Sequence, residues 1–444
     1  MQITYFTHQY FPRSIGGTEV YTRGLALRAQ RAGHSVRVIS HVESPSLDRN
    51  DYKAIATEHE GIPVTEIHYN LSRAAHPARA EYDNPHIVEL LKPELERNKP
   101  DIVHAVHAMK LSGAALNLCY EMQLPVVLTL ADYWFICPRH TLIRWNEELC
   151  DGPRHDLDCL RCVHELHGFA GEVAHKLPAP FLRVASTIGL TVLGESQPRS
   201  WRDIQAIRER QNCLRETVQR ADRVIALSDF QKKMFVLHGY PAEKIQVLHH
   251  GLETEGLKPA VARASKPIEI VFIGSLVYHK GAHVLIEALA RRPDLKMRLR
   301  LYGDNNGTNP YLDSLRRRAA ADDRVEFMGT FPPRELGRVL ETADALAMPV
   351  LWYENEPLVV KAARYIGLPI LASNIGTLAD SIKEGINGVL LAPGDVDAWA
   401  NALVSFRRHN LPQDLSIKSM DDNARELLAL YQEIHSNRCS KPSI

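Results

Sequence analysis

The most informative segment of the chain reads Trp352-Tyr353-Glu354-Asn355-Glu356-Pro357-Leu358-Val359-Val360 and continues into Gly367-Leu368-Pro369-Ile370-Leu371-Ala372-Ser373. The pattern predicts an acidic loop, a proline at a helix start, a turn and a buried strand. Proline suits the first helical turn because its missing N–H would have no partner there. The free N–H groups that follow, at the positive end of the helix, suit an anionic ligand. The segment thus offers carboxylates for hydroxyls beside amides for phosphate, and a nucleotide-sugar carries both groups.

The composition indicates an ordinary soluble globular protein. The chain has 444 residues, of which 45% are hydrophobic and 24% charged, and this length fits two or three domains, two being the better fit. Lys plus Arg equals Asp plus Glu at 53 each, and this zero net charge argues against bulk nucleic-acid binding. The N-terminus has no signal-peptide pattern, and no apolar stretch approaches the ~20 residues that span a bilayer. We therefore expect a cytoplasmic protein.

The N-terminal part alternates between strand and helix patterns. A strand at Ile3–Thr7 is followed by the turn Gly16-Gly17-Thr18-Glu19, a helix that ends at Gly33, and a strand at Ser35–Ser40. Further strands are expected at 100–105, 124–130, 222–228 and 245–248. This alternation predicts a parallel sheet with helices on both faces.

The second half repeats the alternation after a linker at about 253–267. Strands are expected at 268–273, 297–302, 324–328, 345–348, 369–372 and 388–391. The predicted fold class is therefore α/β, with two facing, doubly wound Rossmann-like domains. Ligands of such sheets bind beyond the carboxyl ends of the strands, so a cleft is expected between the domains. The expected boundaries are 1–255, with a cysteine-rich insertion at about 132–215, then 256–412, and a C-terminal helix in 413–444 that crosses back.

In order and spacing, these pieces resemble the retaining glycosyltransferases of family 4, which have the two-domain fold called GT-B. The resemblance covers most of the chain and rests on four stretches, Gly16-Gly17-Thr18-Glu19, Asp101-Ile102-Val103-His104, Phe272-Ile273-Gly274-Ser275 through Lys280-Gly281, and Trp352 to Ser373. It implies transfer of a sugar from a nucleotide-diphosphate donor to a glycan or lipid-linked acceptor, usually in bacterial polysaccharide synthesis. No metal is expected in the active site.

The resemblance also implies a set of site residues. The donor-binding residues would be Gly16, Gly17, Gly274, Ser275, Lys280, Glu354, Pro357, Leu358 and Val359, and the catalytic ones Glu354, Lys280 and Asp132. The ammonium group of Lys280 would stabilise the departing diphosphate. Each assignment has a plainer alternative: a surface lysine at 280, a charged loop at 354, a simple turn at Gly16 and Gly17, and a turn cap at Asp132. His107 is a candidate for the same cleft rim, or a structural histidine.

Three positions depart from the family pattern. Ala131 stands where many relatives have histidine, Ser275 where arginine is frequent, and Ala362 where a second glutamate holds the ribose. Lys361 is one residue away from that position, about 100° around the helix, and is expected to point elsewhere. These departures keep open a non-catalytic binding or scaffold protein on the same fold. Redox chemistry with a dinucleotide is disfavoured, because no G-x-G-x-x-G follows the first strand.

Four cysteines, Cys137, Cys150, Cys159 and Cys162, form a C-x12-C-x8-C-x2-C pattern. Four thiolates from one loop suit a structural zinc ion, which would stabilise a loop without a core of its own. Plain thiols and disulfides are the alternatives, and a cytosolic setting disfavours disulfides. An iron–sulfur cluster is less favoured. The apolar segment 177–194 is expected either to cover the first domain's core or to make a peripheral membrane contact.

Overall fold

The structure is a computed structural model that describes residues 1–444 except 49–50, 154–158, 160–161, 163–198, 262–266, 305–308, 410 and 440–444. It divides the chain into two compact units, Met1–Leu248 with Asn423–Ile444, and His249–Asp422. Each unit is built on one β-sheet of its own. The apolar segment 177–194 lies outside the described residues.

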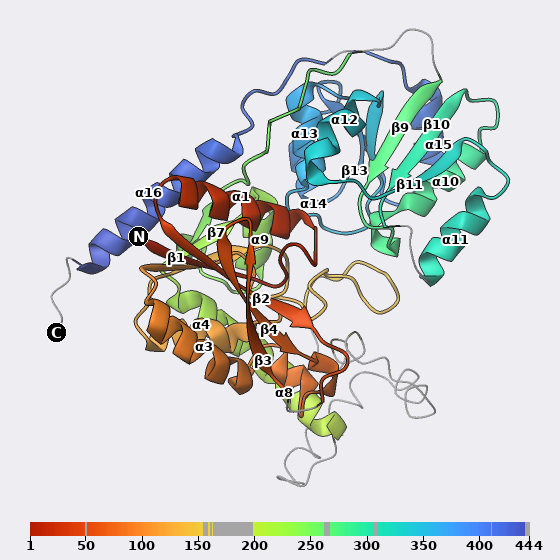
Figure 1. The fold of residues 1–444 in the computed structure, drawn as a ribbon. Helices are drawn as coiled ribbons and strands as arrows, with labels where there is room; N and C mark the ends of the chain where they lie inside the picture. Colours follow the sequence, from red (N-terminus) through yellow and green to blue (C-terminus); the bar gives the residue numbers. More distant parts are fainter. Residues whose placement is uncertain are drawn as a thin grey trace. The chain divides into compact units, whose positions relative to one another are not determined.

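The first unit contains an eight-stranded sheet in the order β3-β4-β2-β1-β5-β6-β7-β8 (Figure 1). Its strands are β1 Gln2–Thr7, β2 Ser35–Glu43, β3 Lys53–His59, β4 Ile62–Tyr69, β5 Ile102–Ala105, β6 Val126–Leu130, β7 Arg223–Ala226 and β8 Ile245–Val247. All neighbours pair in parallel except β3 with β4. Every residue of β5 and β6 is buried, as expected for central parallel strands that helices cover on both faces.

The helices of this unit are α1 Gly17–Arg31, α2 Pro77–Ala80, α3 Pro85–Asn98, α4 Ser112–Glu121, α8 Arg199–Arg220, α9 Asp229–Leu237 and, from Asn423 onward, α16 Met420–Cys439. The hydroxyl of Tyr21 in α1 donates to Asn423 Oδ1 at 2.7 Å. Tyr431 Oη lies 2.5 Å from His104 Nδ1 of β5. The last helix of the chain therefore packs on the first sheet, beside α1 (Figure 1).

The hairpin of β3 and β4 has no counterpart in the predicted strands. Its turn is Glu60-Gly61, and both residues are in the left-handed region, with φ of 52° and 75°. Two such residues are the requirement of the tight turns that join antiparallel strands. Because β3 is exposed on both faces, its sequence shows no alternation of apolar and polar residues. The hydrophobic pattern therefore gave no signal for this edge strand.

The second unit contains a six-stranded, fully parallel sheet in the order β11-β10-β9-β12-β13-β14. The strands are β9 Ile268–Ile273, β10 Met297–Tyr302, β11 Val325–Gly329, β12 Ala345–Met348, β13 Ile370–Ser373 and β14 Gly388–Leu391. The helices are α10 Ala282–Ala290, α11 Pro310–Ala319, α12 Leu336–Glu341, α13 Leu358–Ile366, α14 Gly376–Ser381 and α15 Val396–Ser405. Short 3-10 turns span Leu71–Arg73 and Ala242–Lys244 in the first unit, and Tyr278–Lys280 and Pro333–Glu335 in the second. The predicted fold class, two doubly wound α/β domains, is confirmed.

Candidate functional site

Lys280 is positioned by a glycine that no other residue can replace. It ends the 3-10 turn after β9, and Gly281 then forms the N-cap of α10 with φ of 75°. A Cβ atom on Gly281 would lie 1.9 Å from the carbonyl oxygen of Pro349, just after β12. This close approach of two backbones places Lys280 beside the loop that follows β12.

In that loop Lys280 meets Glu354. The Nζ atom of Lys280 lies 2.6 Å from Glu354 Oε1, and Trp352 Nε1 donates to the same oxygen at 2.8 Å. Lys280 Nζ also lies 4.7 Å from the centroid of the Trp352 ring, a cation–π contact. The Glu354 side chain is 7% exposed and that of Lys280 19%. The two predicted residues thus form one partly buried ion pair, whose cation is the more accessible member.

The helix after this loop begins one residue later than expected. Pro357 is the N-cap of α13, with φ of −69° and ψ of 116°, and Leu358 is the first helical residue. The N–H groups of Leu358 and Val359 belong to the first turn, where an α-helix supplies no acceptor. At the end of β9, Gly274 donates to Tyr302 O at 3.0 Å, and Ser275 O accepts from Val277 N at 3.0 Å. Donor binding by these residues stays a prediction.

Lys361 and Glu356 form a second, fully internal ion pair, which the sequence did not indicate. Lys361 Nζ lies 2.8 Å from Glu356 Oε1 and also donates to His250 O, while His250 N donates to Glu356 Oε2 at 2.6 Å. Burial would raise the pKa of Glu356, but the hydrogen bond from His249 and the charge of Lys361 lower it. Burial lowers the pKa of Lys361, and Glu356 opposes this shift. Glu356 therefore joins the start of α13 to the segment at His249–His250.

In the first unit, three neighbouring parallel strands deliver polar side chains at their carboxyl ends: His8 after β1, His107 after β5 and Asp132 after β6. His107 Nε2 lies 2.9 Å from Asp132 Oδ2, and the backbone N–H of Met109 donates to His107 Nδ1 at 3.2 Å. His107 therefore accepts a hydrogen bond at Nδ1 and donates one from Nε2 to Asp132. Burial would raise the pKa of Asp132, but the charge and hydrogen bond of His107 lower it to about 2. Asp132 Oδ1 also accepts from Trp134 N at 2.7 Å, so Asp132 caps its turn as well.

His8 and Glu19 complete this group, and the sequence analysis did not identify them as site residues. The rings of His8 and His107 have their centroids 4.5 Å apart, and His8 Nε2 lies 3.4 Å from Glu19 Oε1. Gly16 is the N-cap of α1 and Gly17 its first residue, which makes Glu19 the third. A glutamate at that position is the signal of a capping box and was present in the sequence. We call His8, Glu19, His107 and Asp132 the strand-end cluster.

The four cysteines of the insertion are free thiols, and Cys137 and Cys159 are buried. Burial raises the pKa of Cys159, and the nearby Cys137, Cys162 and Cys150 raise it further. Over the described residues, no three His, Cys, Asp or Glu side chains are arranged as a metal site. The zinc site therefore stays a prediction.

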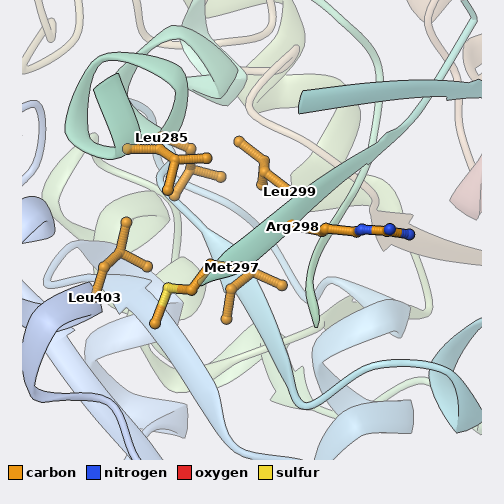
Figure 2. A pocket seen from close by; sticks show the side chains of 7 residues that line it. Leu285, Met297, Arg298, Leu299 and Leu403 are labelled. Atoms are coloured by element: carbon orange, nitrogen blue, oxygen red, sulfur yellow. The ribbon is translucent and has the colours of Figure 1, made fainter. Parts of the chain in front are cut away.

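A small apolar pocket in the second unit lies between α10, β10 and α15 (Figure 2). Figure 2 shows the guanidinium of Arg298 directed away from the aliphatic side chains of Leu285, Met297 and Leu403. The pocket is lined by Ile270, Leu285, Leu289, Met297, Arg298, Leu299 and Leu403. Apart from Arg298, its lining residues carry no acid, base or phosphate-binding group, and the pocket belongs to the packing of the core. Among the described helices, none combines the length and the apolar character needed to cross a bilayer.

Two family models match the chain. "Glycosyltransferase Family 4" matches residues 15–255, and "Glycosyl transferases group 1" matches residues 254–426. A similar curated protein is the D-inositol 3-phosphate glycosyltransferase of Corynebacterium glutamicum (strain R), which is 28% identical over 268 residues, 55% of this chain and 63% of the relative. The protein of that name from Corynebacterium urealyticum is 30% identical over 51% of this chain and 60% of its own length. The matched regions thus span less than two thirds of these relatives.

Solved structures resemble the chain over nearly its whole length. Anabaena HepE in complex with UDP and glucose has a TM-score of 0.59 at 18% identity and covers 99% of this chain and 98% of its own. A sucrose-phosphate synthase from Thermosynechococcus elongatus has a TM-score of 0.60 at 16% identity, covering 98% and 97%. At such identities the likeness shows a shared fold.

Proposed function

The chain belongs to glycosyltransferase family 4, and from this membership we propose that it moves a sugar from a nucleotide-diphosphate-sugar to an acceptor hydroxyl with retention of configuration. The observation that carries the proposal is the Lys280–Glu354 pair at the carboxyl ends of parallel strands. An ammonium group and a carboxylate at this place match the diphosphate and the sugar of such a donor. The cation would face the diphosphate, and the carboxylate would bind hydroxyls of the sugar.

The proposed reaction needs few side-chain steps. The acceptor oxygen forms a bond to the anomeric carbon on the face that the diphosphate leaves, and the bond from that carbon to the phosphate oxygen breaks. The proton of the acceptor hydroxyl passes to the departing phosphate. Lys280, with the N–H groups of Leu358 and Val359, stabilises the growing negative charge, which is the contribution expected of preorganised donors. Positioning by Glu354 supplies the orientation.

We place the acceptor among glycans or lipid-linked saccharides, in cell-surface polysaccharide synthesis on the cytoplasmic side of the membrane. The resemblance of the motifs to polysaccharide-forming members supports this placement. Because HepE binds UDP-glucose, UDP-glucose is the first donor to test.

A panel of UDP-, GDP- and ADP-sugars tests the proposal. One nucleotide class should raise the melting temperature, and slow hydrolysis of that donor should release the nucleoside diphosphate. NMR of the released or transferred sugar should show the donor's anomeric configuration first. If no sugar nucleotide either stabilises the protein or is consumed, the chain is not a glycosyltransferase.

A donor-binding protein without turnover is the second candidate. The specific observation in its favour is the absence of three expected polar groups, at Ala131, Ser275 and Ala362. In the structure Ala362 is fully buried in α13, so no carboxylate stands at the position that holds the ribose in relatives. Thermal stabilisation by a donor that is never hydrolysed or transferred would identify this function.

A further inference from the structure

The N-terminus of α1 is already occupied by a side chain of the protein itself. Glu19 is 3% exposed and its carboxylate folds back toward the N-cap. Burial raises the pKa of Glu19, opposed by hydrogen bonds from the N–H of Glu19, the hydroxyl of Ser14 and the N–H of Gly16. A Cβ on Gly16 would stand 2.6 Å from Glu19 Oε2, so glycine is what lets the carboxylate lie there. The amides of Gly16 and Glu19, which could otherwise attract a phosphate, are hydrogen-bonded to this carboxylate.

A second carboxylate stands across the same strand ends. Asp132 is held ionised by His107 and by the N–H of Trp134. The charge of a phosphorylated ligand would therefore meet two carboxylates in a partly buried setting, where like charges repel strongly. The positive charge of Lys110, which acts on His8, balances only part of this negative charge.

His8 offers the complementary group for a neutral ligand. Its Nδ1 atom is buried and has no hydrogen-bond partner among the described residues. The carboxylate of Glu19, 3.4 Å from Nε2, favours the proton on Nε2, which leaves Nδ1 as an acceptor. Burial, and then the nearby His107, hold the pKa of His8 well below its usual value; Lys110 and His140 act in the same direction and Asp132 opposes them. A neutral imidazole acceptor requires a donor such as a hydroxyl, and a fully ionised phosphate has none to give.

We propose that the strand-end cluster selects an acceptor that is uncharged where it meets β1, with a free hydroxyl donating to His8 Nδ1, and that Glu19 is the residue that excludes phosphorylated acceptors. This inference rests on the proposed glycosyl transfer and names its substrate class. It replaces the expected phosphate contact at Gly16 and Gly17 by an internal carboxylate. It also separates this chain from the relatives whose name specifies an inositol phosphate.

A titration with inorganic phosphate, in the absence of a sugar nucleotide, tests whether Glu19 blocks anion binding at the N-terminus of α1. The titration is made in a Lys280→Ala background, so that the proposed diphosphate site is silent. Phosphate should not shift the melting temperature of this parent, whereas the added Glu19→Ala change should create a saturable upward shift. The matched control is Glu89→Ala, which removes an exposed carboxylate of the same unit (73% exposed) and should behave as the parent. Equal stabilisation of parent and Glu19→Ala variant would overturn the inference.

Pairs of neutral and phosphorylated acceptors test whether the strand-end cluster selects the neutral one. With the donor found active, myo-inositol is compared with inositol 1-phosphate, and glucose with glucose 6-phosphate. The neutral member should have the higher kcat/KM by about tenfold or more, and Glu19→Gln should reduce this ratio about tenfold, because like-charge contact is what rejects the phosphate. His8→Gln should raise the KM for the neutral member more than it lowers kcat. A preference for the phosphorylated member, or a ratio unmoved by Glu19→Gln, would refute the inference while donor consumption left the proposed function standing.

Discussion

The two units present the same local pattern, a strand followed by a glycine turn and a helix, with opposite electrostatic results. In the second unit the glycine turn carries Lys280, whose side chain remains 19% exposed beside Glu354. In the first unit the helix that follows Gly16 and Gly17 receives the buried carboxylate of Glu19 from its own first turn. We predict that the site at Lys280 binds an anion, whereas the N-terminus of α1 already carries a carboxylate of the protein itself.

This difference shows that a glycine turn before a helix does not by itself predict a phosphate site. The turn provides backbone amides in both units, but the charge of one side chain nearby decides what reaches them. In a chain of zero net charge, with 53 basic and 53 acidic residues, we expect such local placement to decide which ligand each helix end accepts. Each unit can therefore be tested separately.

The largest expected effect concerns Lys280. The Lys280→Ala change should lower kcat for donor consumption by about 100- to 1,000-fold, because it removes a preorganised positive charge from the leaving diphosphate. Circular dichroism should be unchanged, since the side chain is partly exposed. Lys258→Ala is the matched control, as Lys258 is 74% exposed in the same unit, and it should keep full activity. Normal turnover by Lys280→Ala would show that the Lys280 site does not bind the diphosphate, and the proposed electrostatic difference from the N-terminus of α1 would then have no functional meaning.

The cysteine insertion gives the next largest effect, in the first unit. We predict about one zinc ion per chain by mass spectrometry and loss of that ion in Cys137→Ser, with a fall in melting temperature of about 10 °C, because structural metal binding contributes directly to folding. Cys213→Ser, a change of a half-buried thiol in α8, should retain the metal. Protein purified without chelator and supplied with zinc, yet free of metal and with all thiols reactive, would disprove the site.

The sequence predicted the central parallel strands of both sheets but missed β4, although most of its residues are buried. The apolar runs of β5, β6, β9 and β12 were found because a central parallel strand reads as a short continuous hydrophobic segment. β3 was missed because both its faces are exposed. Pro357 was expected inside the first turn and is the N-cap, an offset that propensity alone does not resolve.

The sequence predicted only those site residues that belong to a recognisable motif or follow a predicted strand. Lys280, Glu354, His107 and Asp132 were named from the sequence, and the structure pairs them two by two. His8 and Glu19 were not, because their meeting depends on how the chain turns back after β1. The Glu356–Lys361 pair was missed for the same reason: its third partner, the His249–His250 segment, is more than a hundred residues away in sequence.

The Glu356–Lys361 pair can be tested by a double-mutant cycle. Glu356→Gln and Lys361→Met should each destabilise the unit by about 3–5 kcal/mol, because each leaves a buried charge without its partner. The double variant should lose much less than the sum. Urea unfolding of the four proteins measures the coupling. Additive losses would mean that Glu356 and Lys361 do not stabilise the unit as a coupled pair.

The smallest expected effect is the loss of stability at acid pH that buried histidines cause, and it can be assigned to each unit separately. Burial, and then the charge of Lys110, lower the pKa of His41 in β2 to about 3, and burial lowers the pKa of His250 in the second unit to about 4. In the unfolded chain both titrate near 6.5, so the unfolded state binds more protons below that pH. Stability is therefore full above about pH 6.5 and falls as the pH approaches the folded values, by about 1.4 kcal/mol per pH unit for each group.

Hydrogen exchange between pH 7.5 and 4.5 reads this loss in each unit separately. His41→Leu should flatten the pH dependence of the first unit and leave that of the second unchanged, and His250→Leu should do the reverse. His41 is 1% exposed and its ring packs against the ring of Tyr69, so a leucine of similar size fills the same space without a titrating group. A first unit whose acid sensitivity survives His41→Leu but is lost in His8→Gln would owe it to the strand-end cluster, where His8 also has a lowered pKa. In that case the acid response and the acceptor site would share one residue, and acceptor binding would protect the first unit as the pH falls.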